Sequence, residues 1–271
     1  MFPLLRAGRP PRRWFLGPFP LLVAMAALLL ACAAQKEDRS ADVRAQFEEK
    51  YEAWLEYCRQ PEVWSRSRGG EAFVQNQPFR EIIRMGIPIL PVLIEKVETT
   101  PIQGRLLHFA LTDITKKKFH VRQEEIDGQL LWVADEFPDI PPGRSHPDFN
   151  ILWSRWWREQ LHRTPEQFED LYEKWKQPER PEITEENYTR LVDLGIAALP
   201  LMVEKVATGE AGLIPAVSEL TGQAIPPDAQ PAQCLAWWKK EGDMWSIPLP
   251  EQMTEIAPKK IITDKNPQEN P

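Results

Sequence analysis

Histidine is the side chain best suited to moving a proton or holding a metal ion near neutral pH. The chain of 271 residues contains four histidines: His108, His120, His146 and His162. None stands at His-x-x-x-His or His-Glu-x-x-His spacing, which would bring two ligands to one face of a helix. His120 and His146 flank an acidic stretch and could converge with it on a metal, but ordinary loop polarity explains them more simply. We therefore predict no metal site and no cofactor.

Nucleophilic catalysis has no better support in the sequence. The chain lacks the Gly-x-Ser-x-Gly elbow of serine hydrolases and any glycine-rich phosphate-binding loop. Its 40 aspartates and glutamates are so abundant that no pair can be singled out as general acid and base. We predict a protein without catalytic residues. An enzyme with a site around His120 and His146 is the least favoured of three functional hypotheses.

The eleven tryptophans allow two interpretations. Aromatic rings on a surface can bind sugars, whereas tryptophans spaced i, i+3 and i+4 along a helix usually pack inward because each ring buries a large area. Helical spacing favours core packing for four of them: Trp156, Trp157, Trp237 and Trp238. Trp132 and Trp245 fall outside these helical stripes, and we expect them to be exposed.

A self-match at an offset of 109 positions indicates the elements that position these side chains. Residues 86–97 and 195–206 align Gly with Gly, Pro with Pro and Glu-Lys-Val with Glu-Lys-Val, without a gap. In each stretch Gly stops one helix, and the next helix begins a few residues later with apolar residues at i, i+3, i+4 and i+7. The predicted fold is all-α, with two tandem helical-repeat units.

Two helix starts are predicted in the second unit. Thr164 with Gln167 matches a capping box, and Pro165 between them suits a first helical turn. Thr184 with Asn187 is predicted to open the following helix, which ends at Gly195.

The two copies differ most between their last threonine and their tryptophan pair. The first copy has an insert here, residues 116–150, roughly three times as long as its counterpart. Loops of that length are uncommon in compact units unless they are functional or disordered. Its candidate partner-binding residues are Trp132, His120, His146 and Phe137. The predicted organisation is a signal peptide at 1–31, a lipidated cysteine and tether at 32–40, unit 1 at 41–163, unit 2 at 164–246 and a disordered tail at 247–271.

The paired stretches at 86–97 and 195–206 resemble HEAT-type repeats, in which Gly ends one helix and Leu residues of the next fill a shared core. Leu220-Thr221-Gly222 followed by Trp237 and Trp238 is similar to an element of exported bacterial HEAT-like proteins. The resemblance implies an α-α superhelix that binds through a helical surface, without catalysis. The copies are about 100 residues long rather than single hairpins, which argues for two stacked helical subdomains instead of a regular superhelix.

The N-terminus has the parts of an export signal. Four arginines precede an apolar run at residues 21–30, which is too short for a comfortable transmembrane helix. The run ends in Leu29-Leu30-Ala31-Cys32, which resembles a bacterial lipobox, and that resemblance implies an acylated Cys32 as the mature N-terminus. A plain secretory signal is the alternative. The adjacent Arg12 and Arg13 also fit a twin-arginine signal, so the export route stays open.

Net charge narrows the class of partner. The first 31 residues carry four arginines and no carboxylate, so their removal takes the formal net charge from −7 to −11. Such a surface repels phosphate backbones, which makes nucleic acid an improbable partner. It also excludes a polybasic patch as the main membrane anchor, which leaves the lipid on Cys32.

Cys58 and Cys234 are the cysteines left after Cys32. An oxidising compartment would permit a disulfide between them. Each falls on the apolar face of a predicted helix, however, so two buried thiols are the preferred interpretation.

Together these patterns favour a non-catalytic, lipid-anchored protein of the bacterial cell envelope that acts as a protein-binding scaffold. The periplasmic face of the outer membrane is favoured if the cell is Gram-negative. Binding of cell-wall polysaccharide through tryptophans is the alternative. The sequence identifies neither the partner nor the oligomeric state.

Overall fold

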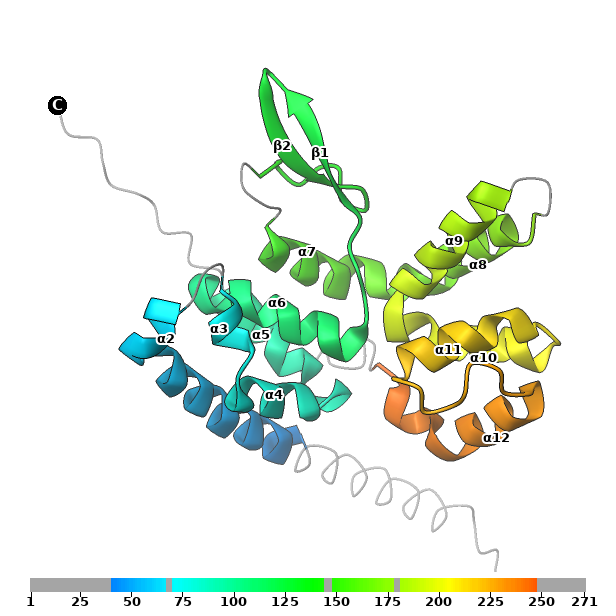
Figure 1. The fold of residues 1–271 in the computed structure, drawn as a ribbon, viewed down its shortest axis with the longest axis horizontal. Coiled ribbons are helices and arrows are strands. Elements are labelled where there is room, and N and C mark those ends of the chain that lie inside the picture. The colour runs from blue at the N-terminus through cyan, green and yellow to red at the C-terminus, as the bar shows by residue number, and fades with distance from the viewer. Residues whose placement is uncertain (1–39, 67–69, 144–147, 178–180, 248–271) are drawn as a thin grey trace, which may run out of the picture. The chain divides into compact units, whose positions relative to one another are not determined.

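The computed structural model describes residues 40–66, 70–143, 148–177 and 181–247, and the chain is largely helical there (Figure 1). The predicted signal peptide, Cys32 and most of the predicted tail lie outside the described residues. Residues up to Gln46 belong to a separate unit from the chain that begins at Phe47. Among the described helices, none is both long and apolar enough to span a bilayer.

The first described helix covers residues 40–58 and is followed by three short helices: α2 (Pro61–Arg66), α3 (Glu71–Val74) and α4 (Gln77–Arg84). Tyr51 and Trp54 lie one turn apart and are both buried, with ring centroids 5.6 Å apart. The Trp54 indole donates to the Phe73 carbonyl at 2.6 Å, which satisfies its polar atom inside the core. Asn76 caps α4 by accepting from the Phe79 amide.

Gly86 and Gly195 turn the chain in the same way. Both have a positive φ, 68° and 73°, a conformation that favours glycine. A 3-10 turn follows Gly86 and another begins at Gly195, and an α-helix follows each turn. The elements are η1 (Ile87–Ile89) and α5 (Leu90–Thr99) in the first stretch, and η4 (Gly195–Ala198) and α10 (Leu199–Ala207) in the second. The prediction that a helix stops at each glycine and another begins soon after is confirmed.

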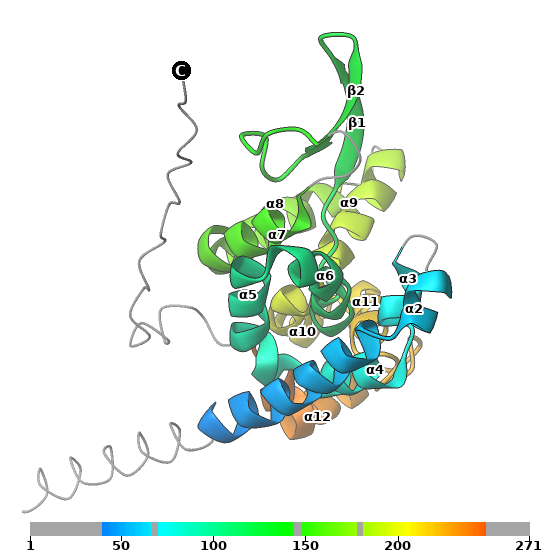
Figure 2. The ribbon, with the colours of Figure 1, turned by 90° about the vertical axis from the view of Figure 1, so that its left-hand side faces the viewer.

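The insert corrects the all-α prediction. After α6 (Pro101–Thr115) the chain forms an antiparallel hairpin of β1 (Val121–Ile126) and β2 (Gln129–Ala134). Its register pairs Val121 with Ala134 and Ile126 with Gln129. The turn residues Asp127 and Gly128 have φ values of 53° and 75°, as a type I′ turn requires. The hairpin projects from the helices in both ribbon views (Figures 1 and 2).

A helix with a bulge returns the chain from the insert. It consists of α7 (Phe149–Arg155), a π-helical turn η2 (Trp156–Gln160) and a 3-10 turn η3 (Leu161–Arg163), and α8 (Thr164–Trp175) follows directly. The capping box predicted at Thr164 does not form, because the preceding turn continues into α8. Gln167 instead donates to the Gln160 side chain at 2.7 Å.

The C-terminal helices enclose an apolar cluster of buried residues. They are α9 (Pro181–Asp193), α10, a 3-10 turn η5 (Ala211–Leu213), α11 (Ile214–Leu220), α12 (Pro231–Glu241) and a 3-10 turn η6 (Gly242–Trp245). The start of α9 predicted at Thr184 is wrong, because the helix begins at Pro181, which suits a first turn. Thr184 lies inside it and donates to the Gln177 carbonyl.

The tryptophans differ in how deeply they are buried. Trp156 and Trp157 are buried, as predicted, with 3% and 7% of their surface exposed. Trp237 and Trp238 are only half-buried on α12, where they contact each other and pack against the C-terminal cluster. Trp132 is also half-buried, so the expectation that it is exposed is only partly met.

The two described cysteines do not form a disulfide. Both are free thiols: Cys234 is buried, as predicted, whereas Cys58 is half-buried.

Candidate functional site

A pocket of about 230 Å³ opens where the base of the hairpin meets η2, α8 and α9. Its lining combines aromatic and aliphatic side chains with three basic and three acidic groups. The residues are Lys117, Phe119, His120, Asp135, Glu136, Phe137, Trp156, Gln160, Gln167, Asp170, Leu171, Arg190 and Leu194. Because these residues come from both ends of the hairpin, the pocket depends on the pairing of β1 with β2.

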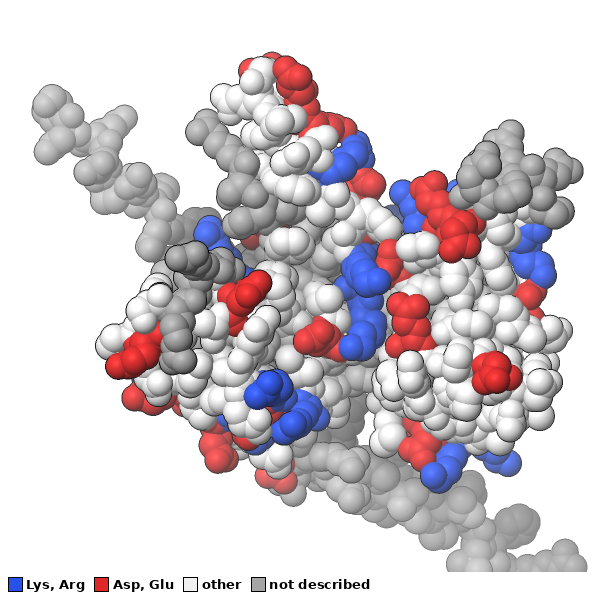
Figure 3. Space-filling model, viewed as in Figure 1, with Lys and Arg blue, Asp and Glu red and all other residues white. Residues whose placement is uncertain are grey.

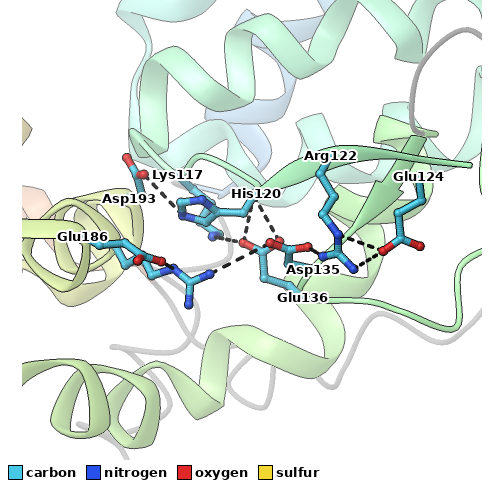
Figure 4. A network of polar contacts seen from close by, with 9 residues as sticks. Lys117, His120, Arg122, Glu124, Asp135, Glu136, Glu186 and Asp193 are labelled. Atoms are coloured by element: carbon cyan, nitrogen blue, oxygen red, sulfur yellow. Dashed lines mark hydrogen bonds and ion pairs between the residues drawn. The ribbon is translucent and has the colours of Figure 1, made fainter. Parts of the chain in front are cut away.

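Lys117 and Glu136 join the chain segments just before β1 and just after β2, at the base of the hairpin. The Lys117 ammonium lies 3.0 Å from Glu136 Oε1 and also donates to the Lys118 carbonyl at 2.7 Å. Its side chain is only 6% exposed, so this charge is compensated within the protein. Glu136 also accepts from the backbone amide of His120, at 3.2 Å to each oxygen (Figure 4).

Asp193, the last residue of α9, attaches the insert to the C-terminal helices. Its side chain is 8% exposed and lies 3.3 Å from His120 Nε2 through Oδ2. Its Oδ1 atom meets the Lys118 ammonium at 3.1 Å, as an ion pair rather than an aligned hydrogen bond. The Lys118 amide donates to the Asp193 backbone carbonyl at 3.1 Å. One residue of α9 thus contacts two residues of the segment that leads into β1.

A second line of alternating charges runs from α9 to the hairpin (Figure 4). Glu186 and Arg190 pair one helical turn apart at 3.5 Å, and Arg190 lies 4.0 Å from Asp135. Asp135 pairs on its other side with Arg122, which also contacts Glu124. Exposed pairs of this kind contribute little stability individually. They show that the Asp135 end of the hairpin lies beside α9.

Gly195 explains why α9 approaches the insert so closely. A Cβ atom placed on it would lie 2.3 Å from the Thr115 carbonyl oxygen and 2.6 Å from the Lys117 amide nitrogen. Lys116, between those two residues, ends α6 in the left-handed conformation with φ 56°. Only glycine at 195 leaves room for this turn, and the turn directs Lys117 and Lys118 toward the pocket and Asp193.

Aromatic rings form part of the apolar wall of the pocket, beside Leu171 and Leu194. Phe119 packs edge-on against Trp153, with centroids 4.9 Å apart, and contacts Phe137 at 6.4 Å. Trp156 contributes from the π-helical turn, a local widening of the helix that is frequent at functional sites.

Arg155 contacts two residues of the loop after β2, Phe137 and Asp139. This guanidinium lies 4.9 Å from the Phe137 ring and donates to Asp139 at 2.6 Å and to Glu159. The hydrogen bond from Arg155 lowers the pKa of Asp139, and the bonds to both carboxylates raise the pKa of Arg155. The guanidinium therefore keeps Phe137 in place as part of the wall.

The polar groups that line the pocket are three carboxylates, two side-chain amides, one ammonium, one guanidinium and one imidazole. The pocket lining contains no Ser, Thr, Cys or Tyr, so no hydroxyl or thiol nucleophile faces His120 there. His120 turns its Nε2 atom to Asp193. Across the described ranges, no group of three His, Cys, Asp or Glu residues is placed to hold a metal ion.

The four residues predicted to contact a partner lie in different places in the structure. His120 and Phe137 both line the pocket, but Phe137 is 1% exposed, so it shapes the wall and cannot project as a contact residue. Trp132 lies on β2, exchanges backbone hydrogen bonds with Gly143 and does not line the pocket. His146 lies outside the described residues.

Sequence reasoning missed Lys117, Arg190 and Asp193. A signal for Asp193 was present, because the self-match aligns it with Arg84, and the two copies therefore carry opposite charges just before their shared glycine. The hairpin also had a signal, Asp127-Gly128 between two stretches of strand-forming residues.

Comparison with known proteins adds no relative: no protein-family model, curated protein or solved structure matches this chain.

Proposed function

We propose that this protein is a non-catalytic binding scaffold of the bacterial cell envelope, anchored by a lipid on Cys32. In this proposal the pocket at the base of the hairpin receives one bulky apolar side chain of a protein partner. The observation that carries the proposal is the pocket itself, an opening of about 230 Å³ with an aromatic wall and charges that already have partners.

The size of the pocket favours a side chain over a free small molecule. Sites for drug-sized ligands span roughly 300–1,000 Å³, whereas 230 Å³ is enough for a single large apolar group. Protein interfaces concentrate their binding energy in such anchors, which enter a preformed pocket surrounded by polar groups. Lys117, Asp135 and Glu136 would supply that polar border without needing a charged ligand.

The scaffold in this proposal consists of two tandem HEAT-like units. The shared backbone turn at Gly86 and Gly195, each followed by a 3-10 turn and an α-helix, supports it. Solenoid-like helical repeats present extended surfaces for partners, which agrees with a binding role.

The anchor is tested at Cys32. Mass spectrometry of the mature protein is expected to find an acylated Cys32 at the N-terminus, and Cys32→Ala is expected to move the protein from the membrane fraction to the soluble fraction. An unmodified N-terminus downstream of Cys32 would refute the lipid while leaving the pocket proposal intact.

The pocket is tested with a random-peptide display library selected on the purified protein. Leu171→Phe should fill the pocket, whereas Leu235→Phe enlarges an equally half-buried leucine that packs against the same apolar cluster and lies outside the pocket. We expect selected peptides to share one bulky apolar residue, and to bind the Leu235→Phe variant but not the Leu171→Phe variant. Equal binding to both variants would refute the pocket as the binding site.

A further inference from the structure

The outer edge of β1 has free backbone groups. Trp132 points its amide and carbonyl away from β1, because both bond to Gly143 on the other side of β2. Gln123 is the residue opposite Trp132 in the ladder, so its amide and carbonyl point away from β2. By the same alternation, the amide and carbonyl groups of Val121 and Glu125 also point away from β2. No described residue pairs with this edge, since the sheet contains β1 and β2 alone.

The opposite edge shows that this hairpin accepts an extended chain. Gly143, nine residues beyond the end of β2, lies against Trp132 and forms two backbone hydrogen bonds with it, 2.8 Å and 3.0 Å long. The protein's own chain therefore covers the β2 edge at this position. The β1 edge offers the same pattern of donors and acceptors without a described occupant.

The charge beside the open edge is negative. The single cation on β1, Arg122, is already paired with Glu124 and Asp135. Glu125 and Asp127 are exposed, and neither forms an ion pair with a described residue. Acidic side chains accordingly gather toward the tip of the hairpin in the space-filling view (Figure 3). A strand that adds here gains from carrying Lys or Arg and loses from carrying Asp or Glu.

We propose that the β1 edge binds an extended, basic segment of a partner protein, which adds to the hairpin as a third strand. The inference rests on the proposed scaffold function and names the kind of partner segment. β1 starts directly after His120, a lining residue of the pocket, so a segment on this edge runs past the pocket mouth. Backbone hydrogen bonds supply the strand contact, and a side chain entering the pocket supplies selectivity.

The experiment uses three synthetic peptides of about ten residues, enough to cover β1. The first alternates Val and Lys, the second alternates Val and Glu, and the third is the Val-Lys peptide with every amide N-methylated. Hydrogen exchange of the Gln123 and Glu125 amides is measured by NMR. We expect the Val-Lys peptide to slow both amides about tenfold or more, and the other two peptides to leave them unchanged. Equal binding of the N-methylated peptide, or no slowing by the Val-Lys peptide, would overturn the proposal.

A variant tests the same edge from the protein side. Gln123→Pro removes an outward amide that the β1–β2 ladder does not use, and proline is tolerated at such edge positions. We expect it to weaken Val-Lys binding about tenfold, while Gln123→Ala has no effect. Exchange of the Arg122 and Glu124 amides in the free variant verifies that the hairpin is intact. If the hairpin is lost, the N-methylated peptide decides the question.

The pocket variant separates this inference from the proposed function. Leu171→Phe should leave slowing of the Gln123 amide by the Val-Lys peptide unchanged, because valine does not need the pocket. If the Leu171→Phe variant no longer binds the selected library peptides but the Val-Lys peptide still slows the Gln123 amide, both the pocket and the strand proposals are supported. Edge binding without any pocket effect refutes only the pocket, and a pocket effect without edge binding refutes only the strand.

Discussion

Gly195 and Thr115 lie in backbone contact, so that a methyl group on Gly195 would come within 2.3 Å of the Thr115 carbonyl oxygen. The two residues are 80 positions apart, one at the end of α6 and the other just after α9. This contact brings the segment that leads into the hairpin against α9, so that Lys118 and His120 reach Asp193. The pocket therefore depends on a glycine that does not line it.

The first prediction concerns that contact. Gly195→Ala should lower the free energy of unfolding by about 3 kcal/mol or more, because a positive φ and a backbone clash act together. Gly222→Ala is the matched control, since Gly222 has a φ of 64° and nothing within 4 Å of the added carbon. We expect the control to lose only about 1 kcal/mol in urea unfolding. Equal losses in the two variants would show that the contact is not close.

The second prediction concerns the link between Asp193 and Lys118. A double-mutant cycle of Asp193→Asn and Lys118→Met, followed by urea unfolding, should give a coupling energy of about 1 kcal/mol. Asp193 is shielded from solvent, with 8% of its side chain exposed, whereas 59% of the Lys118 side chain is exposed. The exposed pair of Lys174 and Asp170 within α8 is the control, and should show less coupling. A zero coupling for the first pair would mean that the Lys118–Asp193 ion pair adds no stability beyond the other contacts between the insert and α9.

The helices were more predictable than the site. Apolar spacing and the Gly-Pro punctuation around residues 86–97 and 195–206 mark helix ends directly, because those signals act within a few residues. The pocket instead joins Lys117, Glu136 and Arg190 from separate elements, and no local pattern states which of many charges will meet. The hairpin is an intermediate case, since Asp127-Gly128 is a local turn signal that helical expectations obscured.

The start of α8 also shows that a local sequence pattern can predict the wrong contact. Thr164 has the right residue type and spacing for a cap, but the π-helical turn at 156–160 and the 3-10 turn after it carry the chain into α8 without a break. Gln167 then finds Gln160 as its partner instead of the cap. These two turns contain the buried residues Trp156, Trp157 and Leu161, and a prediction from local propensity does not take such burial into account.

The third prediction separates two tryptophans. Trp156 is 3% exposed and packs edge-on against Trp153, with centroids 5.4 Å apart, so Trp156→Ala should cost about 3–5 kcal/mol. Trp132 is half-buried on the hairpin, and Trp132→Ala should cost about 1–2 kcal/mol. Thermal unfolding followed by far-ultraviolet circular dichroism measures both. A larger loss at Trp132 would show that the hairpin packs more tightly than its exposure indicates.

The fourth prediction concerns Cys58. Burial raises the pKa of its thiol from 9.0 to about 11, and burial also raises the pKa of Cys234. The thiolate is the reactive form, so both residues should react slowly with a disulfide reagent at about pH 8 in the folded protein and quickly in guanidinium chloride. Fast reaction of Cys58 in the folded protein would contradict its shielding, and a missing thiol in the unfolded protein would reveal a disulfide.

The raised pKa of Cys58 also predicts that the free energy of unfolding falls as the pH rises. Because the folded protein holds the Cys58 proton more tightly than the unfolded chain, this contribution to stability is fully present below pH 9.0 and is lost as the pH rises to about 11. Cys58→Ala removes that contribution. Its free energy of unfolding should therefore fall less steeply than that of the original protein across this window, while tyrosines and lysines affect both proteins alike. Urea unfolding at several pH values measures the two slopes, and identical slopes would mean that water reaches the Cys58 thiol in the folded state.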